Sequence, residues 1–170
     1  MPAPLVVMVT GAGPGLGKST LAARVHAHLS ATEPRAELFR EEDIPTNPCF
    51  TEVSATFRGS GQVRVVQLPL TGDITAGLAR AAAREGAGWL ERFIARTEAY
   101  PARDAGLVGV EGAVDYLVRS APREVALLGT TPWPVVEVDA DAGADAAFAA
   151  AVAEITRRRP LRQVHGQRSW

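Results

Sequence analysis

The sequence contains a single cysteine, Cys49, among its 170 residues. One cysteine excludes an internal disulfide and any metal site built from several cysteines. Long apolar runs are also missing, since no stretch reaches the roughly 20 residues that a membrane-spanning helix needs. The N-terminal residues lack the basic segment of a signal peptide. We therefore expect a cytoplasmic protein with no membrane partner.

Neither sign of charge is in excess. The chain has 18 basic and 19 acidic residues and a formal net charge of -1. This balance gives no electrostatic support for binding nucleic acid, so we expect no nucleic-acid partner. A content of 46% hydrophobic and 22% charged residues is typical of a globular domain with a sizeable core. The oligomeric state stays open between a monomer and a homodimer.

Lysine is almost missing as well, because Lys18 is the only lysine among the 18 basic residues. A chain that otherwise uses arginine keeps an ammonium group here. That compact charge on a flexible stem suits a role that a planar guanidinium fills poorly. The lone lysine also excludes the Asn-Lys-x-Asp guanine motif of GTPases.

Lys18 lies in a glycine-rich segment between an expected strand and an expected helix. Residues 5–10 (LVVMVT) form an apolar, β-branched run that is typical of a strand buried in a parallel sheet. Apolar residues then recur every four positions over residues 21–29, as in a helix. The segment between them reads GPGLGKST over residues 13–20. This order of strand, loop and helix is the context of the phosphate-binding P-loop, or Walker A motif.

The residue types of this loop suit phosphate chemistry. Glycines leave room for backbone N–H groups to surround a phosphate chain, and the helix directs its positive end at the anion. Lys18 would reach the outer phosphates, and the Ser19 hydroxyl would bind Mg²⁺. The simpler alternative is a glycine-rich turn. The predicted nucleotide-binding residues are Gly13, Pro14, Gly15, Leu16, Gly17, Lys18, Ser19 and Thr20.

Strand and helix patterns alternate along the rest of the chain, which predicts an α/β fold with a mainly parallel sheet of about four to five strands. Further helices are expected over residues 71–85 and 144–157. Between them, one helix is expected to end near Arg119 and a new one to begin at Pro122. Further strands are expected over residues 36–40, 63–68 and 135–138.

From residue 5 to about residue 159 the chain resembles the P-loop small-molecule kinases, such as uridine, thymidylate and shikimate kinases. The resemblance implies a three-layer α/β/α fold of the P-loop NTPase type over residues 1–159. Residues 160–170 belong to a basic segment with few apolar residues, so we expect them to form a loosely ordered tail. It also implies an ATP-dependent and Mg²⁺-dependent phosphotransferase. Such an enzyme would move the γ-phosphoryl group to a hydroxyl or phosphate of a small metabolite, nucleoside-like or natural-product-like.

The resemblance assigns a role to an acidic cluster formed by Glu41, Glu42 and Asp43. In these kinases an acidic residue after the second strand often accepts the proton of the acceptor hydroxyl or helps to hold the metal. Asp43 is our first choice and Glu41 our second, and the predicted metal ligands are Ser19, Glu41 and Asp43. The alternative is a solvated charged loop.

The resemblance also implies a mobile lid over residues 71–88, with Arg80 and Arg84 four positions apart on its helix. Residues at this spacing share one helix face, so both guanidinium groups could grip the γ-phosphate. We therefore predict that Lys18, Arg80 and Arg84 act in catalysis together with Asp43 and Glu41. The competing interpretation places both arginines on a solvated face.

One part of the chain departs from the kinase pattern. The family has a further strand and flanking helices before the strand that precedes its lid. Here only a short segment separates Phe50 from Val63. This departure favours the alternative function, a regulatory or degenerate nucleotide-binding module without transferase activity.

Overall fold

The structure, a computed structural model, describes residues 5–33, 36, 38, 64–100 and 106–158. Its sheet consists of the strands β1 (Leu5–Thr10), β2 (Arg64–Thr71) and β3 (Val138–Asp139). They are parallel and lie in the order β1-β2-β3, so β2 is central. The predicted α/β class with a parallel sheet is confirmed. The described residues contain three strands, and the strand predicted at 36–40 lies largely outside them.

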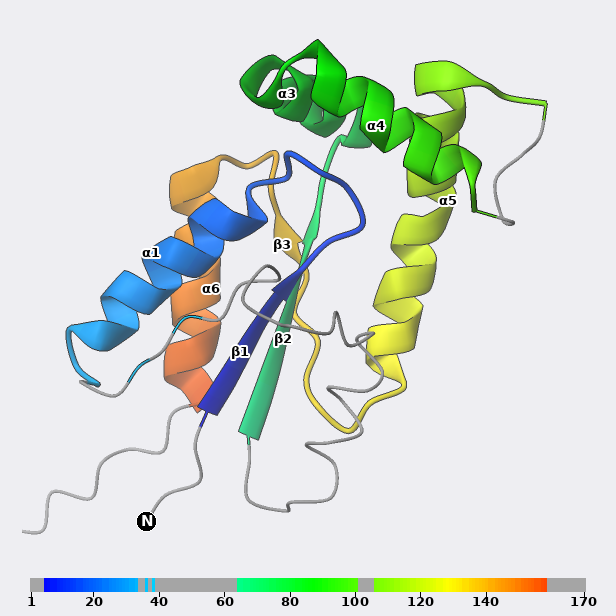
Figure 1. Cartoon of the computed structure of the whole chain (residues 1–170). Coiled ribbons are helices and arrows are strands. Elements are labelled where there is room, and N and C mark those ends of the chain that lie inside the picture. The colour runs from blue at the N-terminus through cyan, green and yellow to red at the C-terminus, as the bar shows by residue number, and fades with distance from the viewer. Residues whose placement is uncertain (1–4, 34–35, 37, 39–63, 101–105, 159–170) are drawn as a thin grey trace, which may run out of the picture.

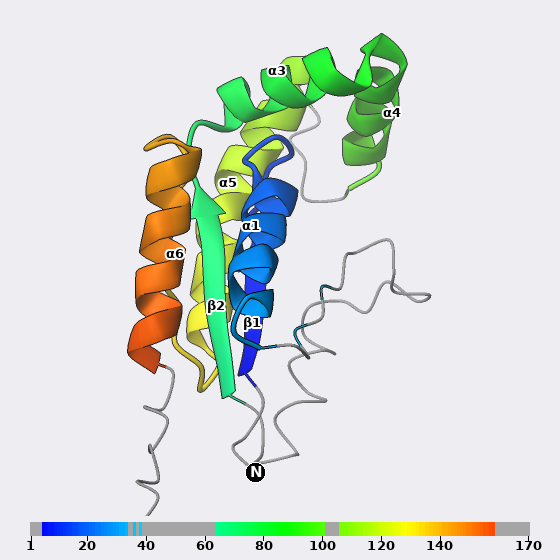
Figure 2. The same cartoon turned by 90° about the vertical axis from the view of Figure 1, so that its left-hand side faces the viewer.

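Five helices surround this sheet in the described part of the chain. Figures 1 and 2 show α1 and α6 together on one face of the sheet and α5 on the other, while α3 and α4 lie beyond the carboxyl ends of the strands. This arrangement is compatible with three α/β/α layers. The helices are α1 (Lys18–Ser30), α3 (Ile74–Glu85), α4 (Ala87–Glu98), α5 (Gly109–Gly129) and α6 (Ala144–Arg158).

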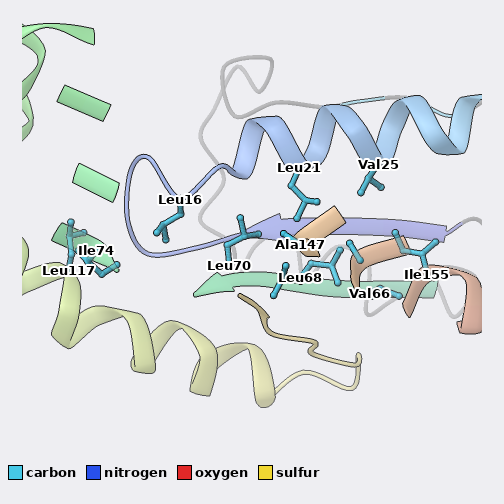
Figure 3. Close-up of a cluster of buried hydrophobic side chains, with 12 residues drawn as sticks. Leu16, Leu21, Val25, Val66, Leu68, Leu70, Ile74, Leu117, Ala147 and Ile155 are labelled. Atoms are coloured by element: carbon cyan, nitrogen blue, oxygen red, sulfur yellow. The ribbon is translucent and has the colours of Figure 1, made fainter. Parts of the chain in front are cut away.

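The main core lies between the sheet and the helix pair α1 and α6. Side chains of a strand alternate between its two faces, and Val66, Leu68 and Leu70 of β2 all join this core. Leu21 of α1 and Ile155 of α6 pack into the same cluster, as Figure 3 shows. The other face of β2 therefore carries the intervening residues, and it turns toward α5.

On that second face the buried Gln67 joins β2 to the end of α5. Its Nε2 donates to the Thr131 hydroxyl at 2.7 Å and to the Leu128 carbonyl oxygen at 3.4 Å. Gln67 is fully buried, so these bonds offset part of the cost of removing an amide from water. They fix the distance between the sheet and the C-terminal part of α5.

The helix α5 differs from the prediction, which ended one helix near Arg119 and began another at Pro122. The structure has one continuous helix with Pro122 inside it. A proline within a helix removes one N–H bond and costs about 3 kcal/mol or more. Packing at both ends offsets that cost, because Ala113, Leu117 and Leu128 are buried.

The strand β2 also extends beyond its predicted end at residue 68 and continues through Pro69 to Thr71. This extension brings β2 level with the first residues of the glycine-rich loop, since Thr10 pairs with Pro69. Among the described helices, none combines the length and the apolar character that crossing a membrane would need.

Candidate functional site

The glycine-rich loop joins the carboxyl end of β1 to the first turn of α1. Gly15 and Gly17 have φ angles of 71° and 89°, in the left-handed region that residues with a β-carbon adopt only at a cost. Leu16 stands between them and is only 4% exposed. In Figure 3 its side chain points into the curve of the loop. Leu16 therefore anchors the loop in the core, and the neighbouring glycines supply the turns.

Lys18 folds back across this loop. Its Nζ donates to the Gly11 carbonyl oxygen at 2.9 Å and to the Gly13 carbonyl oxygen at 2.6 Å. An ammonium group has three donors and no acceptor, so these two bonds hold the positive charge against the backbone of the loop. An anion that entered the loop would meet this charge and could replace a carbonyl oxygen as its partner.

The first turn of α1 adds to the positive potential. Its N-cap is Gly17, which has no side chain to accept the first N–H groups, and the first turn contains no acidic residue. Ser19 and Thr20 are both exposed there. The unpaired N–H groups and the dipole of a helix attract an anion to such an end. The loop, the N-terminal end of α1 and Lys18 therefore all favour an anionic ligand.

Helix α3 lies directly against the loop. A β-carbon built on Gly15 would lie 1.9 Å from the Gly77 carbonyl oxygen, and one built on Gly77 would lie 2.9 Å from the Pro14 carbonyl oxygen. Two backbones meet here without any side chain between them. The contact requires glycine on both sides, and it places the N-terminal half of α3 over the loop.

The two arginines of α3 are placed differently. Arg80 Nε donates to the Gly15 carbonyl oxygen at 3.2 Å, so this side chain reaches the loop. Arg84 Nε instead bonds Glu85 Oε1 at 2.7 Å, and 68% of the Arg84 side chain is exposed. The structure therefore brings Arg80, but not Arg84, into contact with the glycine-rich loop.

The start of α3 is fixed by two carboxylates. Asp73 caps the helix by accepting from the Ala76 N–H at 3.0 Å. Asp141, from the turn after β3, accepts from the Asp73 N–H at 2.6 Å. Sequence reasoning missed Asp141, because its partner lies 68 positions away. These bonds couple the turn between β3 and α6 to the position of α3.

A cavity of about 370 Å³ lies beside the first residues of the loop. It is lined by Gly11 and Ala12 of the loop, by the last residues of β2, and by Pro122 and Val125 of α5. Two carboxylates, Glu124 and Glu137, also line it. Its place between α5 and the sheet was not predicted.

The remaining predicted site residues, Glu41 and Asp43, lie outside the described residues. Within the described ranges no group of three or more His, Cys, Asp or Glu side chains gathers in a way that could hold a metal ion by itself. Ser19 is therefore the one predicted metal ligand that the structure describes. It lies on the exposed first turn of α1, beside Lys18.

Comparisons of the chain with protein-family models, with curated proteins and with solved structures gave no match. The loop, α3 and the cavity are therefore the features of the molecule that bear on its function.

Proposed function

We propose that the chain is an ATP-dependent phosphotransferase of the P-loop kinase type that acts on a small-molecule acceptor. The observation that carries this proposal is the position of Lys18. Its ammonium group lies across a glycine-rich loop at the carboxyl end of β1, and an uncapped helix start follows directly. Positive charge and backbone N–H groups that converge on one loop suit the polyphosphate of a nucleotide.

Mg²⁺ fits this site through the chemistry of its donors. The ion takes oxygen ligands, keeps several waters, and is usually held by few protein groups together with substrate phosphates. The exposed Ser19 hydroxyl is such a donor, so a cluster of described carboxylates is not required. Bound Mg²⁺ would neutralise charge on the phosphates. Glu41 or Asp43 is proposed as a further ligand.

The proposed reaction joins the acceptor oxygen to the γ-phosphorus of ATP and breaks the bond between that phosphorus and the oxygen bridging to ADP. ADP leaves with the electron pair, and the acceptor hydroxyl loses its proton to Asp43 or Glu41. Lys18 and Arg80 would hold the phosphates in position and stabilise the charge that develops on them. The roles that we propose for the described residues are therefore to position the phosphates and to stabilise their negative charge.

A nucleotide-binding module without transferase activity is the second candidate. The placement of Arg84 favours it, because this side chain pairs with Glu85 instead of the loop. A module needs only Lys18, the loop and the helix end. The two candidates therefore share the binding site and differ in whether an acceptor is phosphorylated.

Nucleotide binding is tested by calorimetric titration of ATP with Mg²⁺ into the wild-type chain and into Lys18→Ala. A hydrogen bond to a charged group contributes about 1.5–3 kcal/mol, so we expect affinity for ATP to fall about 10- to 150-fold. Arg24→Ala is the matched control, since Arg24 is a cation of the same helix that pairs with Asp145. Unchanged ATP affinity in a folded Lys18→Ala protein would refute the proposed site.

Transfer is tested separately, by searching for a phosphorylated product after incubation with ATP and a panel of nucleosides, sugars and amino alcohols. A product whose formation requires Lys18 supports the kinase. Saturable ATP binding with no product across the panel supports the module instead.

A further inference from the structure

The cavity beside the loop is lined by two acidic side chains and by no described basic one. Pro69 of β2 and Pro122 of α5 line it, and neither residue has a backbone N–H. The charged side chains on its walls are Glu124 and Glu137, and none of its described lining residues is basic. A ligand in this cavity would therefore need to supply donors or positive charge.

The placement of Glu137 follows from the sheet. Val136 and Val138 pack toward the core on the side of α1 and α6, so Glu137 between them faces α5 by strand alternation. Because Leu70 pairs with Val138, Glu137 stands beside Pro69. It forms one row across this face with Pro69 and Thr10, since Thr10 pairs with Pro69.

Thr10 adds an unsatisfied polar group to this row. Leu5, Val7 and Val9 of β1 pack against the opposite core, so Thr10 lies on the α5 side with Glu137. Its hydroxyl is buried, and no hydrogen-bond partner accompanies it in the structure that the described residues form. A buried polar atom without a partner is unfavourable, and this one lies directly before the cavity residues Gly11 and Ala12.

The remaining lining is mainly apolar, with Thr71 as the one further polar side chain among its described residues. Ala121, Val125, Leu70 and Ile74 contribute to the walls. A volume of about 370 Å³ lies near the lower end of the range for small-molecule sites. It suits one ring-sized apolar body with short polar substituents.

We propose that this cavity binds the acceptor and that the acceptor is an alcohol with a cationic amine on an apolar body. This inference rests on the proposed kinase function, because Gly11 and Ala12 connect the cavity to the phosphate-binding loop. The two carboxylates hold the ammonium group, and the apolar walls cover the body. The hydroxyl of such a molecule then lies on the side of the loop.

The test uses a matched pair of probes, 2-amino-3-phenylpropan-1-ol and 2-methyl-3-phenylpropan-1-ol. They share the ring and the hydroxyl and differ in an ammonium or a methyl group. Calorimetric titration of each into the full chain measures the preference for the charge. Two partly exposed ion pairs, each contributing up to about 1 kcal/mol, predict a preference of about fivefold to thirtyfold for the ammonium probe.

The double variant Glu124→Gln and Glu137→Gln should reduce this preference to about twofold or less, because glutamine keeps the size and loses the charge. Glu111→Gln is the control, since Glu111 is an exposed acid of the same helix that does not line the cavity. It should keep the full preference. Equal affinity for the two probes, or a preference that survives in the double variant, overturns the proposal.

ATP is titrated into the same variants to separate this proposal from the proposed function. Unchanged ATP affinity in the double variant supports an acceptor cavity. A fall in ATP affinity, together with displacement of the amine by ATP, would assign the cavity to the nucleotide and overturn the proposal. Absence of ATP binding in the wild-type chain would instead refute the kinase function, and the preference for the ammonium probe would still decide whether the cavity binds a cation.

Discussion

The contact between α3 and the glycine-rich loop can be tested with four glycine-to-alanine substitutions. They form a two-by-two design, because an added β-carbon can have two separate costs. One is a steric conflict with a neighbouring atom, and the other is strain from a left-handed φ. Gly77 has a steric conflict, Gly17 has a left-handed φ of 89° with nothing within 4 Å, and Gly15 has both. Gly88, in the first turn of α4, has neither, since its nearest neighbour would be an Arg92 nitrogen at 3.5 Å.

The expected magnitudes follow from these features. Replacing glycine by alanine raises the free energy of unfolding by about 0.4–1 kcal/mol where the backbone tolerates it, and Gly88→Ala should show this gain. Relative to Gly88→Ala, Gly77→Ala should be less stable by about 1–3 kcal/mol, the usual cost of overpacking. The conflict is with the Pro14 carbonyl oxygen at 2.9 Å, and backbone yields less readily than a side chain.

The left-handed positions extend the series. Gly17→Ala should lose about 1–2 kcal/mol relative to Gly88→Ala from backbone strain alone. Gly15→Ala should lose about 2–5 kcal/mol, because its strain adds to a conflict with the Gly77 carbonyl oxygen at 1.9 Å. We therefore expect Gly15→Ala to be the least stable of the four.

The assay is urea unfolding of the full-length variants, followed by far-ultraviolet circular dichroism. A helix that is not docked on the loop in solution would relieve the conflict without cost. Gly77→Ala would then be as stable as Gly88→Ala, and Gly15→Ala as stable as Gly17→Ala. Equal stability within both of these pairs of variants would refute the docked position of α3.

Three further predictions concern the proposed site. Arg84→Ala should lower kcat more than it raises KM for ATP, whereas Arg80→Ala should change both, and wild-type kinetics in both variants would remove the phosphate clamp. Asp141→Ala should lower the free energy of unfolding by about 1 kcal/mol, whereas Glu91→Ala, at an exposed position of α4, should stay within about 0.5 kcal/mol in the same urea assay. Asp43→Asn should reduce the transfer rate by ~10²–10⁴ at unchanged ATP affinity, and full activity would exclude Asp43 as the base.

Local patterns made the strand, the loop and the first helix predictable. The apolar run at 5–10 and the GPGLGKST segment can each be recognised from residues that are adjacent in the sequence. The structure has β1 and the start of α1 at these places. A strand was likewise expected over residues 135–138, which read VVEV, and a short β3 begins at Val138. Side-chain periodicity is read within a few residues, so it needs no knowledge of the tertiary fold.

Features that depend on distant contacts could not be predicted in this way. Gly77 looked like one small residue in an alanine-rich helix, and its role depends on a backbone 62 positions away, at Gly15. The proline at 122 indicated a helix start, since local rules place proline in a first turn. The packing of Ala113 and Leu128 on either side overrides that local preference.

The docked position of α3 decides how its two arginines could serve the proposed reaction. A guanidinium group has five N–H donors, and the bond from Arg80 Nε to the Gly15 carbonyl uses one of them. Arg80 could therefore bind phosphate without any movement of α3. Arg84 must first leave Glu85, but an exposed ion pair contributes only about 0–1 kcal/mol, so a phosphate in the loop could compete for it. In the proposed reaction the helix would thus hold one arginine in place before the nucleotide binds, and it would keep the second in a weak pair that the charge of the nucleotide could break.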